Sequence, residues 1–133
     1  MRIWQGFLAS VLVAGLLFSA GGLVGAQESG MRVMRDVLAT AIENRQPVEA
    51  NGQITADVGQ LFYFTDVQGG PGTIQHVWIW QGRTMATVTL EVKSSRFRTW
   101  SSKRIQPDWK GQWRVEARTS DGAVLSFKDF EIE

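Results

Sequence analysis

The chain has 133 residues, with 14 basic and 13 acidic side chains and a formal net charge of +1. That length fits one domain rather than two. The near-equal numbers of basic and acidic side chains argue against a dedicated nucleic-acid-binding protein. Cysteine is absent, which excludes disulfides, thiol catalysis and thiolate metal sites. Five of the six tryptophans lie between His76 and Trp113. Because tryptophan is enriched in strands and brings a large apolar surface, this segment predicts an aromatic β-rich core.

The first 26 residues have the pattern of a secretory signal segment. Arg2 gives a basic start, residues 7–24 are mostly apolar, and small residues precede Gln27. We therefore predict a signal peptide over residues 1–26, a short leader over 27–32 and one folded domain over 33–133, located in the periplasm or secreted. The alternative is an uncleaved inner-membrane anchor, since about 18 apolar residues nearly span a bilayer.

Residues 31–46 carry two conflicting periods. Met34, Leu38 and Ile42 recur every four residues, as on one face of a helix. A spacing of two, typical of a strand, fits another set: Val33, Val37, Ala39 and Ala41. The pattern alone favours a helix, which Pro47 is expected to end.

The rest of the chain predicts strands joined by turns. Ile54, Ala56 and Val58 alternate and predict a short edge strand within residues 53–58. Further strands are predicted over residues 60–67, 73–81, 84–93, 96–105, 112–118 and 123–133, with Gly, Pro, Ser and Asp-Gly turn signals between them.

The last of these strands changes its apolar phase before Phe130, which predicts a bulge at Lys128-Asp129. Six to eight short strands predict an all-β fold, a small antiparallel β-sandwich of immunoglobulin-like type.

Four motifs follow one another in the second half of the chain. They are His76-x-Trp78, the run from Arg96 to Lys103, Gly111-x-Trp113-x-Val115, and Asp121-Gly122-x-Val124-Leu125. Their order resembles the bacterial domain-of-unknown-function family 2914, and similar segments occur at residues 43–47 and 62–65. The resemblance implies a strand over residues 31–46, which we adopt over the helix. The family has no established activity, so the resemblance implies no functional residue.

The candidate catalytic residues are few. His76 is the sole histidine, and one imidazole without neighbouring ligands does not form a typical zinc site. We predict that His76 is hydrogen-bonded inside the core or at its rim. Ser101 and Ser102 lack the Gly-x-Ser-x-Gly turn of a nucleophile, so we expect them to bond backbone groups at a strand end. Asp66 is expected in a turn. We predict no catalytic residue, no metal and no cofactor.

One constellation suggests binding: Arg96, Arg98, Trp100, Lys103 and Arg104. Arginine forks grip carboxylates and phosphates and also stack on indole. An exposed strip of this kind can hold an anionic glycan, a lipid head group or an acidic protein segment. The alternative is a packed arginine–tryptophan ladder with acidic residues of 121–133 opposite. Three candidate rim residues accompany the strip: His76, Trp78 and Trp109.

The sequence therefore predicts an exported, non-enzymatic β-sandwich that binds or scaffolds a cell-envelope component, either a protein or an anionic polysaccharide. One alternative is an envelope hydrolase that uses His76 with a distant carboxylate. Another is a structural module that oligomerises through a free sheet edge at residues 53–58. No nucleic acid is expected as a partner, and membrane contact is expected only through residues 1–26 if they stay attached.

Overall fold

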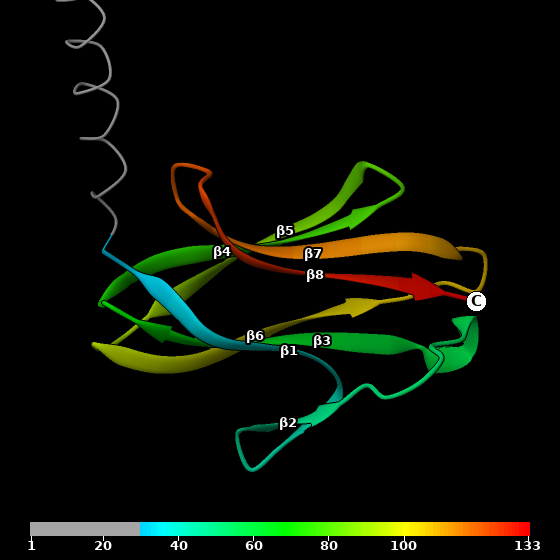
Figure 1. Cartoon of the computed structure of the whole chain (residues 1–133), viewed down its shortest axis with the longest axis horizontal. Coiled ribbons are helices and arrows are strands. Elements are labelled where there is room, and N and C mark those ends of the chain that lie inside the picture. The colour runs from blue at the N-terminus through cyan, green and yellow to red at the C-terminus, as the bar shows by residue number, and fades with distance from the viewer. Residues whose placement is uncertain (1–29) are drawn as a thin grey trace, which may run out of the picture. The chain divides into compact units, whose positions relative to one another are not determined.

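The computed structural model describes residues 30–133, and almost all of this part of the chain lies in β-strands or the turns between them (Figure 1). The strands are β1 (Arg32–Glu43), β2 (Gln46–Glu49), β3 (Gln60–Gln68), β4 (Gly72–Trp80), β5 (Arg83–Val92), β6 (Arg96–Arg104), β7 (Gly111–Thr119) and β8 (Val124–Ile132). The predicted signal segment, residues 1–26, lies outside the described residues. Within those that are described, no helix has the length and hydrophobicity to cross a membrane.

The strands form two four-stranded antiparallel sheets. Sheet A has the order β2-β1-β3-β6, and sheet B has the order β5-β4-β7-β8. With β2 set aside, these orders correspond to strands A-B-E and C′-C-F-G of an immunoglobulin sandwich. The predicted all-β sandwich is thus confirmed. Its regular strands match the alternating sequence pattern, because every second side chain points to the same face of a sheet.

The core lies between the two sheets. Trp78 and Trp113 are its largest fully buried side chains, and Leu61, Tyr63 and Val115 pack with them. A second buried cluster consists of Val67, Ile74 and Val92. These residues come from alternate positions on their strands, so Trp78 and Trp113 of the aromatic segment line the inside of the sandwich, as the predicted aromatic core requires.

Residues 32–43 form a strand, which confirms the conformation implied by the family resemblance. The helical period fails here because Met34, one of its apolar positions, is 53% exposed, whereas Val37 and Ala39 are buried. The element does not end at Pro47. Instead, Asn44 and Arg45 turn the chain with φ angles of 51° and 60°, the left-handed geometry of a tight hairpin.

Pro47 then lies in β2, which pairs with the end of β1 and forms the outer edge of sheet A. An edge strand tolerates proline because one side of it needs no ladder donor. The sequence pattern does not reveal the β1–β2 hairpin, because proline ordinarily ends an element and here lies within the edge strand.

The predicted edge strand at residues 53–58 is wrong. Ile54 makes a single parallel bridge to Ile132, and Ala56–Val58 form a turn of 3-10 helix. The backbone of Glu133 donates to the Ile54 carbonyl at 2.8 Å and accepts from the Ala56 N–H at 2.9 Å. These bonds fasten the segment to the end of β8, so residues 53–58 offer no free edge for oligomerisation.

The predicted bulge in the last strand exists, but at another position. The β7–β8 register is continuous from Gly111↔Ile132 to Ala117↔Ser126 and shifts before Arg118↔Val124. Leu125 is therefore the extra residue, and Lys128-Asp129 lies in regular pairing. The predicted position is wrong because the apolar pattern does not show which side of the strand Phe127 occupies. Phe127 points outward and remains 46% exposed.

Candidate binding surface

The face of sheet A that points away from sheet B carries three of the predicted binding residues. Arg96, Arg98 and Trp100 occupy alternate positions of β6, and their neighbours on β3 are Gln68, Asp66 and Phe64. The Phe64 and Trp100 rings stack with centroids 6.3 Å apart and planes inclined by 12°. Phe64 is nevertheless fully buried, so another element must cover this outer face.

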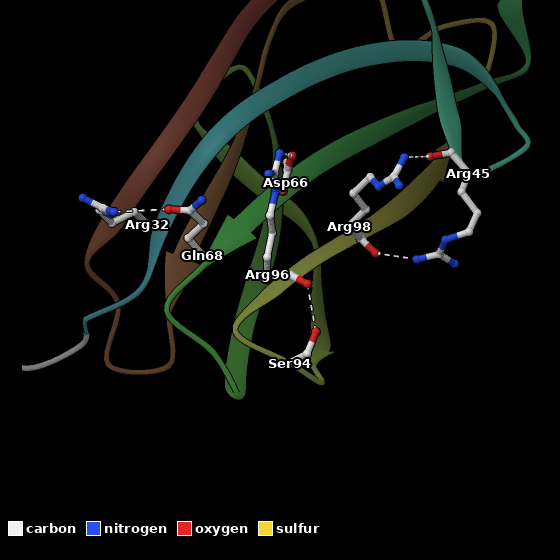
Figure 2. Close-up of polar contacts among 7 residues, drawn as sticks. All are labelled: Arg32, Arg45, Asp66, Gln68, Ser94, Arg96 and Arg98. Atoms are coloured by element: carbon white, nitrogen blue, oxygen red, sulfur yellow. Dashed lines mark hydrogen bonds and ion pairs between the residues drawn. The ribbon is translucent and has the colours of Figure 1, made fainter.

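The β1–β2 hairpin provides that cover. Ile42 packs with a cluster of Val37, Ala39 and Phe64. At the tip, the Arg45 guanidinium donates to the Arg98 carbonyl at 3.1 Å, and the Arg98 guanidinium reaches the Arg45 carbonyl at 3.5 Å (Figure 2). The Arg45 guanidinium also lies 5.2 Å from the Trp100 ring centroid, within the range of a cation–π contact. The hairpin tip is thus fixed to β6.

A cavity of about 590 Å³ opens on this outer face. We call it the arginine groove, and its lining residues are Arg35, Gln46, Asp66, Arg96, Phe97 and Arg98. Arg96 donates to both Asp66 oxygens, at 3.0 and 3.4 Å (Figure 2), and these hydrogen bonds raise the pKa of Arg96. The Arg35 guanidinium lies 5.6 Å from the centre of the Phe64 ring. Three guanidinium groups thus share the groove with one carboxylate.

The structure divides the predicted basic strip. Arg96, Arg98 and Trp100 lie together, and Arg104 is exposed farther along the same side of β6. Lys103 occupies the other side of the strand, where its Nζ lies 4.9 Å from the centre of the Trp109 ring. The five residues therefore form no continuous strip.

The predicted acidic partners from residues 121–133 are wrong as well. The partner of Arg96 is Asp66 on β3, whereas Asp129 pairs with Arg114 at 2.7 Å. Asp66 is a strand residue, not the expected turn former.

Two further arginines of this surface, Arg35 and Arg45, were missed. Arg35 on β1 is paired with Asp66 on β3. This pairing can be inferred only once β1 is known to be a strand. For Arg45, the one signal in the sequence is the preceding Asn44. Asparagine tolerates the positive φ of a hairpin turn, so it indicates a turn at this position.

The outer face of sheet B has a different charge arrangement. Arg114 donates to both oxygens of Asp129, at 2.7 and 2.9 Å. Glu116 lies 2.7 Å from Arg118 and 3.6 Å from Arg114. Two arginines are thus matched by two carboxylates.

His76 lies fully buried in the core. Its Nδ1 is 2.7 Å from Ser101 Oγ, which accepts from Trp78 Nε1 at 3.1 Å. The serine hydroxyl hydrogen is therefore free to point at Nδ1. Nε2 then carries the ring hydrogen and donates to Thr65 Oγ1 at 3.1 Å, and Thr65 donates to the Thr99 carbonyl at 3.2 Å. This order of donors fits a neutral imidazole, and burial lowers the pKa of His76 to about 3.

His76 and Trp78 accordingly lie inside the core rather than at its rim. Ser101 bonds these two side chains, so its predicted role of satisfying backbone groups at a strand end is wrong. Trp109 lies at one end of the sandwich, where its ring centroid is 6.2 Å from those of Trp80 and Trp113. Its ring packs against the core cluster at that end, and its carbonyl accepts from Trp113 Nε1 at 2.9 Å.

A second polar cluster joins the sheets near Asp36. One Asp36 oxygen accepts from Tyr63 at 2.7 Å and from Ser126 at 2.6 Å, and the other lies 3.6 Å from Lys128 Nζ. Burial and the hydrogen bond to Asp36 raise the pKa of Tyr63. Across residues 30–133, no group of three His, Asp or Glu side chains is arranged to hold a metal ion.

These observations define a small immunoglobulin-like β-sandwich that has carboxylate-paired arginines on the outer face of one sheet and an arginine groove on the other. Residues 71–132 match the family model described as "Protein of unknown function (DUF2914)", which confirms the resemblance predicted from the motifs. The match takes in β4 to β8, whereas the β1–β2 hairpin and β3 precede the matched residues. No curated protein matches the chain.

Proposed function

We propose that this protein is an exported, non-enzymatic β-sandwich module that binds an anionic group of a cell-envelope component in the arginine groove. The observation that carries the proposal is the charge of the groove, where Arg35, Arg96 and Arg98 face a single carboxylate, Asp66. Guanidinium forks match the planar oxygens of carboxylates and phosphates. The component is either a protein or an anionic polymer.

The pairing of the groove arginines supports this function. Among the ion pairs of residues 30–133, Arg96 is the groove arginine that has a carboxylate partner, and its side chain is still 67% exposed. Arg98 is held at its position by the hairpin tip through the Arg45 carbonyl. A positioned guanidinium loses less rotamer freedom when it binds a ligand, which favours affinity.

Two further observations support the remaining parts of the proposal. The signal pattern of residues 1–26 favours export. His76, the side chain best suited to general base catalysis, has no exposed surface, and both of its ring nitrogens are hydrogen-bonded within the core. A general base must reach the proton that it removes from a substrate, so a non-enzymatic module agrees better with this burial than a hydrolase does.

The test uses protein purified from the envelope fraction of an expressing bacterium. Binding is measured to polygalacturonate, to a polyphosphate and to neutral dextran at increasing salt concentration. We expect the anionic polymers to bind, and their affinity to fall with salt. Combined Arg35→Ala and Arg98→Ala should weaken binding at least about tenfold, because hydrogen bonds to charged groups contribute about 1.5 to 3 kcal/mol each.

The matched control combines Arg83→Ala and Lys110→Ala, which removes the same charge from exposed positions outside the groove lining. An equal loss of binding in both double variants would contradict a groove-specific site. Recovery of the protein only from the cytosol would contradict export, and His76-dependent hydrolysis of envelope material would contradict a non-enzymatic role.

A further inference from the structure

The β3–β6 ladder leaves one side of β6 open. Just beyond its two ends, Gly69 N–H donates to the Ser95 carbonyl and Ile105 N–H donates to the Gly59 carbonyl, at 2.8 and 3.0 Å. Hydrogen-bonded pairs alternate along an antiparallel ladder. In the continuous register of this pair, the odd-numbered residues of β6 therefore bond to β3. The backbone N–H and C=O groups of the even-numbered residues point away from it: Arg98, Trp100, Ser102 and Arg104.

This open side is the place where an immunoglobulin sandwich carries strand D, next to strand E. Within residues 30–133, β6 pairs with β3 alone. Two carbonyls at the start of β6 accept side-chain donors, since Ser94 Oγ bonds the Arg96 carbonyl at 2.8 Å and Arg45 bonds that of Arg98 (Figure 2). The stretch from Trp100 to Arg104 has no such cover among the described residues, so it forms a strand edge that can still pair.

The surroundings of this edge are hollow and basic. A second cavity, of about 260 Å³, lies beside the first half of β6 and meets this edge at Trp100; its lining residues are Arg45, Glu91, Lys93, Phe97, Arg98, Thr99 and Trp100. Three of these side chains are cationic and one is anionic, and the exposed Arg104 lies farther along the same strand. An added strand with acidic residues would therefore meet opposite charges, which stabilise neighbouring strands when they lie across from each other.

We propose that β6 binds an extended acidic segment of a partner protein, which adds to sheet A as a further strand in the position of strand D. This inference rests on the proposed function, because it names the anionic envelope component as a protein segment. Main-chain hydrogen bonds to Trp100 and Ser102 supply affinity, and the flanking arginines select acidic side chains at alternate positions. A second copy fits less well, because antiparallel β6–β6 pairing centred on Trp100 or Ser101 sets arginine opposite arginine.

The test compares three peptides of eight residues in which glutamate and valine alternate. One peptide is unmodified, one carries N-methyl groups on the glutamates, and one carries them on the valines. In an added strand, every second N–H faces β6. We therefore expect N-methylation of one set to weaken binding at least about tenfold, while N-methylation of the other set leaves the affinity nearly unchanged.

A pair of variants tests the protein side. Ser102→Pro removes an N–H that points away from β3, so the β3–β6 ladder keeps its bonds and an edge strand tolerates the ring. Ser102→Ala is the matched control, since it retains the N–H. We expect Ser102→Pro to weaken binding of the unmodified peptide at least about tenfold and to leave polygalacturonate binding unchanged, with thermal melting used to check that both variants fold. If Ser102→Pro does not fold, the N-methylated peptides decide.

The outcomes separate this inference from the proposed function. Equal binding of both N-methylated peptides, or peptides that fail to bind while polygalacturonate binds in the arginine groove, overturns strand addition and leaves the groove. Absence of binding to any anionic probe overturns both. Concentration-dependent dimerisation that Ser102→Pro abolishes assigns the edge to a second copy and overturns the acidic partner.

Discussion

The outer faces of the two sheets both carry arginines, but they hold them differently. On sheet B, Arg114 and Arg118 are matched by Asp129 and Glu116. On sheet A, the three guanidinium groups of the arginine groove share Asp66. The net charge of the whole chain conceals this difference. Carboxylate partners on the same strand, such as Glu116 for Arg118, or on the neighbouring strand, such as Asp129 for Arg114, therefore decide which basic residues remain available to a ligand.

The two faces also differ in their apolar residues. On sheet A, Phe64 points away from the core and is still fully buried, because the β1–β2 hairpin packs over it. On sheet B, Phe127 is 46% exposed and lies under the Arg114 guanidinium, 4.1 Å from ring centroid to Cζ. Sheet A thus carries a small hydrophobic cluster of its own on the outer face, and Arg35 of the arginine groove lies over its Phe64 ring.

The largest expected effect tests this difference in packing. Phe64→Ala should lower the free energy of unfolding by about 3 to 5 kcal/mol, the usual loss for a buried phenylalanine. Phe127→Ala, on the other face, should cost less than about 1 kcal/mol. Urea denaturation of the two variants measures both values. Similar losses would show that the hairpin does not bury Phe64 in solution.

The next largest effect is the pH dependence of stability, which we expect from His76 in the core between the two sheets. Burial lowers its pKa to about 3, whereas an unfolded imidazole titrates near 6.5. The unfolded chain therefore binds more protons between these values, and stability should fall as the pH drops from about 6.5 toward 3, by up to about 1.4 kcal/mol per pH unit. Denaturation at several pH values measures this slope.

His76→Gln should remove most of that slope, because glutamine does not titrate. Arg98→Ala and Arg118→Ala, one from each outer face, should retain it. If the slope persists in His76→Gln, the carboxylates of the two faces, and not His76 in the core, cause the acid sensitivity.

Much of the sandwich could be predicted from the sequence, because alternation reports which side of a strand each residue occupies. Alternation accounts for the inward Trp78 and Trp113 and for the shared side of Arg96, Arg98 and Trp100 on β6. The same rule places Lys103 on the opposite side, so including it in the strip was an avoidable error.

The pairing of strands was not predictable in this way. Asp66 and Arg96 are thirty positions apart, and Arg45 meets Arg98 through a hairpin that Pro47 concealed. Alternation gives the side of a strand on which a residue lies but not the neighbouring strand, so the groove emerged only from the structure.

The smallest effect concerns a single pair on sheet B. Hydrogen bonds from Arg114 lower the pKa of Asp129 below its ordinary value. Arg114→Ala should raise that pKa back toward the ordinary range, by a modest amount because both side chains are partly exposed. Carboxyl chemical shifts followed by NMR against pH measure the change, and high salt should reduce the difference between the two proteins.

Arg98→Ala is the control from the other face, and it should leave the titration of Asp129 unaltered. An Asp129 that titrates identically in Arg114→Ala would mean that the pair is not formed in solution, and that Arg114 is as free to bind an anion as the arginines of the groove. In that case the contrast between the two faces, from which the binding surface is inferred, would no longer hold.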